Sequence, residues 1–249
     1  MASVKRILIS QNKPSNTAQY AALTEKYGVS FDFVPFFLIE PLTSREFRSQ
    51  RINLPEFTAV VFSSRHAIDA YFALCEELRV KVPETMKYFC TTEAVAMYLQ
   101  KHIVYRKRKI FFGSGTPESV VEQIGVKHQG ENFLITTSDV SGSEALTKLF
   151  DAKEIKYTPA VFIKSVPQEI KDIDLHSYDM IVLYNQADMT SLKVNFPEFE
   201  QGEIKFVSFG KSIVKAMNEA GLSIEIQAPT PEAPSVSKAL DLYLAKNNN

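Results

Sequence analysis

Short apolar runs alternate along the chain with segments in which apolar residues recur at every third or fourth position. The clearest example is AVVFSSRHAIDAYF at residues 59–72, where the apolar or small run Ala59–Ser63 is followed by Ser64, Arg65 and His66. The run predicts a buried strand, and the apolar spacing after it predicts a helix that Ser64 caps. The pattern therefore indicates a strand, a polar turn and a helix in direct succession.

The same unit repeats with different residues in each turn. The pattern predicts strands at 6–10, 30–39, 59–63, 87–91, 109–113, 132–137, 157–166, 180–185, 205–209 and 224–228. Besides the helix that completes the unit 59–78, it predicts helices at 17–27, 43–53, 92–102, 117–127, 143–153, 187–195, 212–220 and 235–246. Short apolar strands joined by helices form parallel sheets with helices on both faces, so the predicted fold class is α/β.

Two long extended runs, Ser30–Ile39 and Tyr157–Val166, each contain a proline. Because proline cannot donate a hydrogen bond to a strand ladder, each run should lie at a sheet edge or leave its sheet at that point. One run precedes the middle of the chain and the other follows it, which indicates two linker strands at about 30–40 and 157–166. We therefore predict two domains, a discontinuous one of residues 1–38 plus 164–249 and an inserted one of residues 39–163.

Composition limits the function classes. The 249 residues are 45% hydrophobic and 23% charged, which are ordinary globular values. No apolar run approaches the roughly 20 residues of a membrane span, and the start lacks the apolar region of a signal peptide. The two cysteines, Cys75 and Cys90, form no disulfide framework, and His and Cys lack zinc-ligand spacing. We therefore expect a reduced, cytoplasmic protein without a structural metal.

The charge pattern does not indicate a nucleic-acid binder. The net charge is −1, and the one dense basic run, Tyr105–Lys109, precedes a predicted strand. We interpret this run as a solvated connection, and recruitment of anions is the alternative.

The usual catalytic signatures are missing, because the sequence has no GxGxxG, P-loop, G-x-S-x-G or HExxH motif. Of the four histidines only His66 lies at a strand-to-helix turn, where it serves either as a surface donor or as a catalyst. Several predicted strands end instead in small polar side chains, which are either simple helix caps or one wall of an anion-binding cleft. These residues are Ser63-Ser64, Thr91-Thr92, Thr136-Thr137-Ser138, Asn185-Gln186 and Gly210-Lys211-Ser212. Taken together from two domains, they suit a flexible polyanionic ligand.

Four segments in this order resemble the uroporphyrinogen-III synthase family, in the version found in Bacteroidetes: VVFSSRHAIDAYF, CTTEAVAMYLQ, VSFGKSIVKAMNEAGL and APTPEAPSVSKALDLYL. The resemblance covers nearly the whole chain. It implies two three-layer α/β domains of flavodoxin- or Rossmann-like type, joined by a two-stranded β linker, with one domain inserted in the other.

The resemblance also implies the reaction. Hydroxymethylbilane, a linear tetrapyrrole with eight carboxylates, loses its terminal hydroxyl as water and closes with inversion of its D ring through a spiro intermediate. No metal or cofactor is implied. The enzyme would fold the substrate and assist the leaving group, while backbone N–H groups and hydroxyls hold the carboxylates and the domains close around the ring.

The family's positions match this chain unevenly. Its Thr-Ser matches Ser63 and Ser64, and its basic residue matches His66, with Arg65 alongside. Its Gly-x-x-Thr-Ala turn falls on Cys90–Ala94, with Glu93 in place of the threonine.

The second half of the chain departs further from the family pattern. The tyrosine proposed as proton donor in the family is Phe162 here, so the catalytic residue stays unassigned. Tyr157 or Tyr184 could supply the missing phenol, and the alternative is that both tyrosines only pack in their strands. The family's Ser-Pro-Ala/Ser-Gly segment becomes Asn185–Asp188, which places Asp188 where amides should receive a carboxylate. The last turn becomes Gly210–Val214 and gains Lys211. The predicted substrate-binding residues are Ser63, Ser64, Arg65, His66, Thr91, Thr92, Ser138, Phe162, Asn185, Gln186, Ala187, Lys211 and Ser212.

From this resemblance we expect a monomeric, cytoplasmic uroporphyrinogen-III synthase, a lyase that acts on the small molecule hydroxymethylbilane and has no cofactor, nucleic-acid or membrane partner. One alternative is a catalytically degenerate homologue that binds a tetrapyrrole or another polyanion, and Phe162 is the residue that separates the two. A more distant alternative is a two-lobed sensor shaped like a periplasmic binding protein, against which the lack of an export signal counts.

Overall fold

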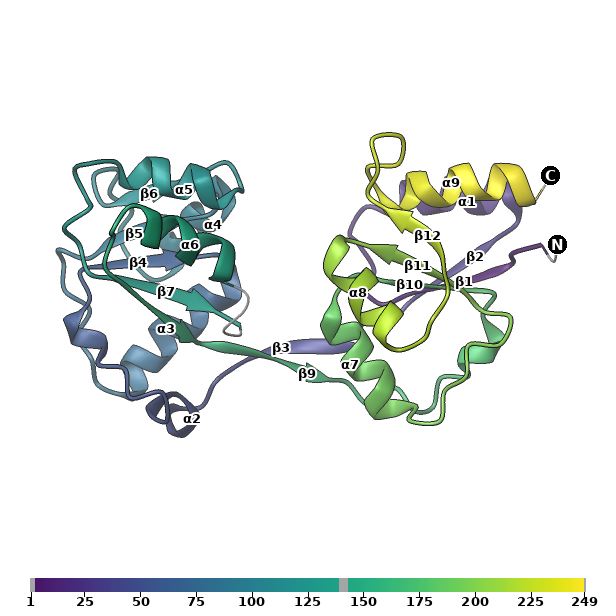
Figure 1. The fold of residues 1–249 in the computed structure, drawn as a ribbon, viewed down its shortest axis with the longest axis horizontal. Helices are drawn as coiled ribbons and strands as arrows, with labels where there is room; N and C mark the ends of the chain where they lie inside the picture. Colours follow the sequence, from purple (N-terminus) through teal and green to yellow (C-terminus); the bar gives the residue numbers. More distant parts are fainter. Residues whose placement is uncertain (1–2, 139–142, 249) are drawn as a thin grey trace. The chain divides into compact units, whose positions relative to one another are not determined.

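The computed structural model describes residues 3–138 and 143–248. The chain forms two compact units, Met1–Leu38 with Val166–Asn249 (unit 1) and Ile39–Ser165 (unit 2) (Figure 1). The second crossing lies two residues later than the predicted boundary. Each unit is built on a parallel sheet, so the predicted α/β class is confirmed.

Unit 1 has a five-stranded sheet in the order β12-β11-β10-β1-β2, and every neighbouring pair is parallel. Its strands are β1 (Arg6–Ile9), β2 (Ser30–Phe33), β10 (Met180–Leu183), β11 (Lys205–Phe209) and β12 (Ile224–Ala228). Its helices are α1 (Ala18–Tyr27), the 3₁₀ helix η4 (Leu175–Ser177), α7 (Gln186–Asn195), α8 (Lys211–Glu219) and α9 (Val236–Asn247).

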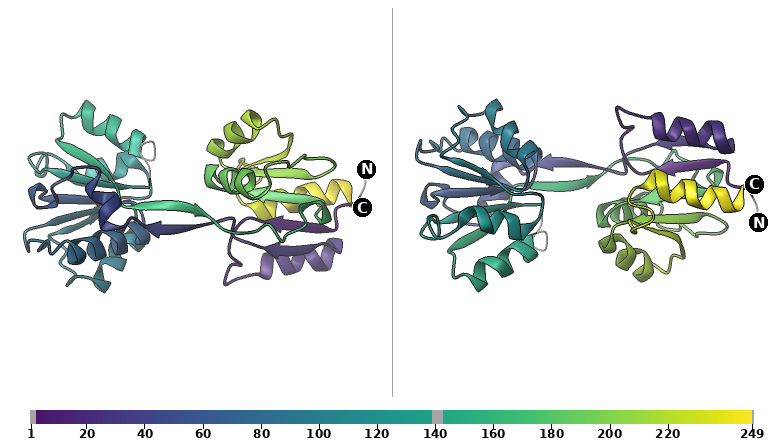
Figure 2. Two further views of the ribbon diagram at one scale, coloured as in Figure 1. Left: turned by 90° about the horizontal axis from the view of Figure 1, so that it is seen from below. Right: turned by 90° about the horizontal axis from the view of Figure 1, so that it is seen from above.

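Side chains on successive strand residues point to opposite faces of the unit 1 sheet, which gives the unit two cores. Ile7 and Val182 pack with α1 and α9, whereas Leu8 and Ile181 pack with α7 and α8. Figure 2 shows these two helix layers on either side of the sheet. Strands buried on both faces explain why the sequence reads as continuous apolar runs rather than as alternation.

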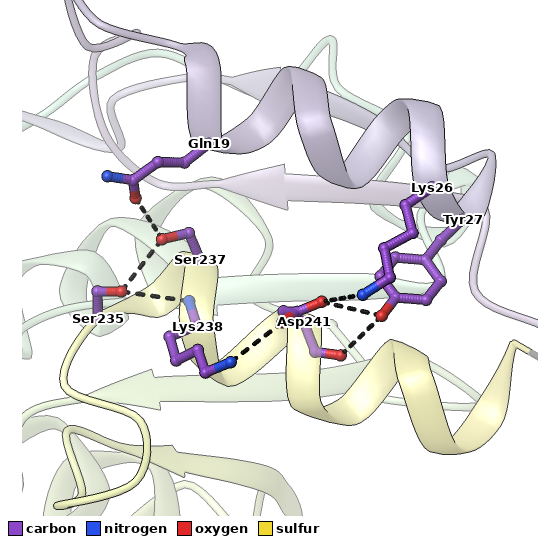
Figure 3. A network of polar contacts seen from close by, with 7 residues as sticks. All are labelled: Gln19, Lys26, Tyr27, Ser235, Ser237, Lys238 and Asp241. Carbon is purple, nitrogen blue, oxygen red and sulfur yellow. Dashed lines mark hydrogen bonds and ion pairs between the residues drawn. The ribbon is translucent and has the colours of Figure 1, made fainter.

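The two ends of the chain are bound together in unit 1. Asn248 Nδ2 donates to the Val4 carbonyl at 2.7 Å, and the Val4 amide donates to Asn248 Oδ1 at 3.1 Å. Helices α1 and α9 are also joined by a polar network, in which the Asp241 carboxylate accepts from Lys26 and Tyr27 (Figure 3). These contacts make unit 1 a single structure although unit 2 interrupts its sequence.

Unit 2 has a second five-stranded parallel sheet, in the order β6-β5-β4-β7-β8. Its strands are β4 (Ala59–Phe62), β5 (Lys87–Cys90), β6 (Ile110–Phe112), β7 (Phe133–Thr137) and β8 (Tyr157–Val161). Its α-helices are α2 (Ser44–Arg48), α3 (Arg65–Glu77), α4 (Glu93–Tyr98), α5 (Pro117–Ile124) and α6 (Glu144–Ala152), and its 3₁₀ helices include η1 (Leu54–Glu56) and η2 (Leu99–Lys101). Val60 and Phe62 pack with α3 and α4, while Val61 packs with α5 and α6.

The chain passes between the units in two paired strands, β3 (Phe37–Pro41) and β9 (Ile163–Pro167). The Leu42 amide donates to the Phe162 carbonyl and the Gln168 amide to the Phe36 carbonyl, both at 2.9 Å, so the two strands are antiparallel. The chain therefore has a two-stranded linker of the kind that the resemblance implied.

The predicted linker strands are wrong in extent, because each extended run is divided. In the first run, β2 ends at Phe33 and β3 begins at Phe37; the side chain of Phe36 between them is fully buried in the core of unit 1. In the second run, Phe162 separates β8 from β9: its amide bonds to Thr137 of the sheet, while its carbonyl bonds to the linker. Only the inner half of each run belongs to the linker.

The helix predicted over 43–53 is also wrong beyond Arg48. Thr43 and Glu46 form a capping box that starts it, but α2 has only five residues. Arg51 follows with a φ of 56°, a left-handed conformation that a right-handed helix cannot contain. In the same way, Gly125 at φ 51° ends α5 before the predicted Lys127.

Candidate functional site

Strand β4 lies at the point of the unit 2 sheet where the chain changes direction. From β4 the chain moves to β5 and β6 on one side, and then crosses to β7 and β8 on the other. In an open parallel sheet, ligands bind outside the carboxyl ends of the strands at such a switch point. The predicted residues Ser63, Thr91 and Ser138 directly follow β4, β5 and β7, so the topology brings them to one edge.

The two serines in the turn between β4 and α3 have different roles. Ser64 is the N-cap of α3, because its hydroxyl accepts from the Ala67 amide at 3.1 Å. Ser63 is exposed, and its hydroxyl makes no hydrogen bond with the described residues. The amides of Arg65 and His66, at the start of α3, likewise have no acceptor in the part of the chain that the structure describes. This turn thus offers one hydroxyl and two amides at the positive end of a helix.

The turn between β5 and α4 has the same construction. The Thr92 hydroxyl caps α4 by accepting from the Val95 amide at 3.3 Å. The Thr91 hydroxyl donates to the Ser63 carbonyl at 3.3 Å, which ties the two turns together. Glu93, which replaces the family's threonine, is exposed in the first turn of α4.

A cavity of about 180 Å³ opens at this edge of unit 2. Its polar lining includes Ser63, Thr91, Thr137 and Ser138, and its apolar floor includes Val61 and Ile135. The predicted Thr136 also lines the cavity, but it is buried and its hydroxyl donates to the Val61 carbonyl at 2.8 Å. Hydroxyls around an open cavity, next to a turn with free amides, suit carboxylates of a ligand.

A cluster around Asp69 adjoins this edge on the α3 side. Its carboxylate accepts from the Tyr98 hydroxyl at 2.7 Å, Lys101 Nζ at 3.0 Å and His102 Nε2 at 2.7 Å. Burial alone would raise the pKa of Asp69, but these three bonds outweigh it and lower the pKa to about 2. The Arg65 guanidinium carbon lies 5.4 Å from the centre of the Tyr98 ring, so the cluster also contacts a predicted ligand residue.

Asp69 and Tyr98 were not among the residues predicted from the sequence. The spacing of Asp69, four residues after Arg65 and three after His66, places it on their side of the helix and was a usable signal. Nothing local in the sequence marks Tyr98, which reaches Asp69 from the next helix.

Phe162 is 1% exposed and lies in the core of unit 2. The centre of its ring is 4.9 Å from that of Phe47 and 5.7 Å from that of Tyr71. A side chain enclosed in this way does not face a ligand, so the structure does not support Phe162 as a substrate-binding residue.

The two tyrosines suggested as replacements are also engaged elsewhere. Tyr157 begins β8, at the amino end of the strand, and its hydroxyl donates to Asp151 Oδ1 at 2.9 Å. Tyr184 does follow β10 at the carboxyl end of its strand, where its ring packs on Phe209. Burial raises the pKa of Tyr184 well above its ordinary value, and the neighbouring Tyr20 acts in the same direction. Neither phenol is placed as a free proton donor.

In unit 1, side chains of the turn between β10 and α7 accept from most of the amides of that turn. Asp188 is fully buried, and its Oδ2 accepts from the amides of Tyr184 at 2.8 Å and Asn185 at 3.1 Å. Asn185 Oδ1 accepts from the amides of Ala187 and Asp188, which completes a capping box. Burial raises the pKa of Asp188, against the effect of the two amides. Asp188, the acidic residue that was unexpected from the family pattern, therefore accepts hydrogen bonds from the amides of its own turn.

The turn between β11 and α8 is open in comparison. Gly210 is the N-cap of α8, has a φ of 117° that favours glycine, and provides no side-chain cap. Ser212 is exposed in the first helical turn. The side chain of Lys211 lies outside the described residues, so its predicted contact with an anion stays a prediction.

Two further observations bear on the class of site. Among residues 3–138 and 143–248, no group of three or more His, Cys, Asp or Glu side chains is placed to hold a metal ion. No helix in the described part of the chain has the length and apolar character needed to cross a membrane.

Comparison with known proteins gives a consistent result. The family model described as uroporphyrinogen-III synthase HemD matches residues 18–238. A crystal structure of a mutant uroporphyrinogen III synthase from Thermus thermophilus is similar at 14% identity and a TM-score of 0.51, over 96% of this chain and 97% of that one. The wild-type enzyme from the same organism gives 14% identity, 97% coverage of each chain and a TM-score of 0.43. No curated protein matches the sequence significantly.

Proposed function

This chain belongs to the uroporphyrinogen-III synthase family and is a cyclising lyase of tetrapyrrole biosynthesis, and from that premise we propose how its residues handle the substrate. The substrate is hydroxymethylbilane, which closes to uroporphyrinogen III with loss of water. The observation that carries the proposal is the family match over residues 18–238, together with the unpaired donors at the carboxyl end of β4. No feature of the described residues favours the alternative of a homologue that binds without catalysing.

Unit 2 holds carboxylates of the substrate at the β4–α3 turn. The Ser63 hydroxyl and the amides of Arg65 and His66 donate to one carboxylate, and the Arg65 guanidinium adds a positive charge. A carboxylate is favoured there because it meets unpaired donors and the positive end of the α3 dipole at once. Ser64 and Thr92 contribute by capping their helices, which fixes the geometry of the free amides.

Unit 1 holds a further carboxylate at the start of α8. Gly210 leaves the first amides of this helix without a side-chain cap, and the Ser212 hydroxyl is exposed beside them. Asn185, Gln186 and Ala187 have the smaller part, because Asp188 and Asn185 already accept from four amides of that turn.

The proposed chemistry depends chiefly on positioning. The pyrroles themselves supply the electrons for loss of the hydroxyl, so the protein must bring the two ends of the chain together in one arrangement. Carboxylates bound at fixed turns of rigid sheets achieve this without a metal or a cofactor.

The test couples the purified protein to enzymatically generated hydroxymethylbilane and separates the product isomers. We expect uroporphyrinogen III, formed faster than the spontaneous product. If uroporphyrinogen I alone appears, at the spontaneous rate, the proposed function is wrong.

The site itself is tested with Arg65→Gln, and with Arg45→Gln as a matched control on α2. Arg45 is exposed, and it forms no ion pair with a residue that the structure describes. Loss of an exposed charge contact worth about 1 kcal/mol should raise KM about fivefold in the Arg65 variant. An equal KM in both variants would remove Arg65 from the site.

We further propose that the protein acts as a monomer in the cytoplasm. The thiols of Cys75 and Cys90 are free and buried, and burial raises their pKa values to about 11 and about 12, which suits a reducing compartment. Sedimentation at micromolar concentration checks the monomer, since a dimer would have twice the mass of the chain.

A further inference from the structure

The reaction needs a proton at the leaving group. Hydroxide is a poor leaving group, and a positioned acid that protonates it speeds such a step by about 10² to 10⁴. The three positions considered for a phenol do not provide this acid. Phe162 has no hydroxyl, and Tyr157 lies at the amino end of its strand and bonds to Asp151. The Tyr184 ring packs on Phe209, and burial raises the pKa of its phenol.

A second cavity in unit 2, of about 250 Å³, contains a histidine. Its α3 wall consists of His66, Asp69, Ala70 and Ala73, and its opposite wall consists of Ile39, Pro41 and Ile163 from the inner ends of β3 and β9. The cavity is therefore apolar except for one imidazole and one carboxylate.

His66 joins this cavity to the carboxylate-binding turn. It is the second residue of α3, so its amide belongs to the β4–α3 turn while its exposed ring lines the cavity. A substrate carboxylate bound at the turn would place neighbouring parts of the same pyrrole chain within reach of the ring. Imidazole suits the task by type, because unperturbed histidine is the side chain that changes charge between about pH 5 and 8.

We propose that His66 is the general acid that protonates the departing hydroxyl of the substrate, an inference that rests on the proposed function. The bond between the terminal methylene carbon and the oxygen breaks, and the oxygen keeps the bonding pair. The imidazolium gives its proton to that oxygen, which leaves as water, and the lone pair of the pyrrole nitrogen fills the electron deficit at the methylene carbon. Ring closure later releases one proton from the last pyrrole carbon, and His66 takes it up. The net change is loss of one water.

Asp69 has a supporting part in this arrangement. Its carboxylate stays ionised, held by Tyr98, Lys101 and His102, and it is the negative charge that faces the cavity. A fixed negative charge favours the pyrrole cation that forms as the oxygen leaves. The residues that line the cavity from β3 and β9 carry no charge, and Asp69 lines it beside His66, three residues further along α3.

The test measures kcat and KM for hydroxymethylbilane in His66→Gln and His66→Arg. His176→Gln is the matched control, because His176 is an exposed histidine of unit 1 whose ring stacks on Phe199. For His66→Gln we expect kcat to fall about 100-fold with KM within threefold of wild type, and the decline of kcat at alkaline pH to disappear. His66→Arg keeps a positive charge but gives up no proton near neutrality, so its kcat should stay equally low. Added imidazole should raise the kcat of His66→Gln, and the control should match wild type.

Three results would overturn the assignment. The first is a kcat within threefold of wild type in His66→Gln. The second is recovery of kcat in His66→Arg, and the third is a change in His66→Gln that is confined to KM. Either of the last two results would make His66 a carboxylate ligand only. These outcomes are separate from failure of the proposed function, which would appear as absence of uroporphyrinogen III from the wild-type protein.

Discussion

Phe162→Tyr restores the residue that the family pattern carries at this position, and the structure predicts loss of stability rather than gain of activity. The ring of Phe162 is 1% exposed and has the rings of Phe47 and Tyr71 within 5.7 Å. A hydroxyl added there must be buried among apolar atoms. Such a group costs about 1 to 3 kcal/mol when it finds no partner, and extra volume in a packed core costs a similar amount.

We therefore expect Phe162→Tyr to lose about 2 kcal/mol of unfolding free energy, the middle of that range. For a unit of this size, 1 kcal/mol corresponds to about 3 °C in Tm, so unit 2 should unfold roughly 6 °C earlier. The kcat should stay within twofold of wild type, because the new phenol points into the core. Urea titration and thermal unfolding measure the first effect, and the coupled isomer assay measures the second.

Phe111→Tyr is the control for adding a hydroxyl to a phenylalanine of the same unit. Phe111 stacks on Phe89 but is only half-buried, so its new hydroxyl can reach water and should cost little. A Phe162→Tyr protein with unchanged Tm and a raised kcat would contradict the burial argument, since it would mean that position 162 faces the substrate.

Three further predictions follow from single contacts. Ser64→Ala should lose about 1 kcal/mol of stability because it removes the cap of α3, whereas Ser63→Ala should keep wild-type stability and raise KM. Equal effects of the two substitutions would contradict the separate roles of the two serines. Asp188→Ala should lose about 1 to 3 kcal/mol in urea titration, because it leaves the buried amides of its turn unpaired, and an unchanged midpoint would contradict the capping geometry. Burial, helped by Lys87, lowers the pKa of His128, so below about pH 6.5 the unfolded chain binds more protons than the folded one. The free energy of unfolding should therefore decrease as the pH is lowered from about 6.5, until the pKa of the folded state is passed. His128→Phe should remove this dependence when unfolding is measured from about pH 7.5 to 4.5.

The sequence predicts the local parts of this fold well, for a physical reason. Strands buried on both faces produce continuous apolar runs, so β11 and β12 have the predicted ends at Lys205–Phe209 and Ile224–Ala228. Ser64 and Gly28 lie at helix ends where a cap or a left-handed residue is needed, and both requirements are set by neighbouring backbone atoms.

The failures arise where distant residues decide. The first extended run is divided because Phe36 is buried against residues far along the chain, and the second because Phe162 bonds both to β7 and to the linker. The environment of Tyr184 depends on Tyr20, which no local pattern indicates. Asp188 is a different case, since Asn185 and Asp188 have the spacing of a capping box and the sequence carried that signal.

The helix starts differ in how many of their backbone donors are left for a ligand. In α3, α4 and α7 a side chain caps the helix, and in α7 Asp188 also takes the two amides before it. A helix start whose backbone amides already donate to its own carboxylate has few free donors for a ligand. The start of α8 differs, because Gly210 has no side chain that could cap the helix. Its φ of 117° also disfavours the residues that have such a side chain. In the proposed binding mode, α8 provides the carboxylate contact of unit 1, while the edge of unit 2 provides free amides, a hydroxyl and, beside them, the cavity with His66. We therefore propose that both units bind carboxylates and that the proton chemistry takes place in unit 2 alone.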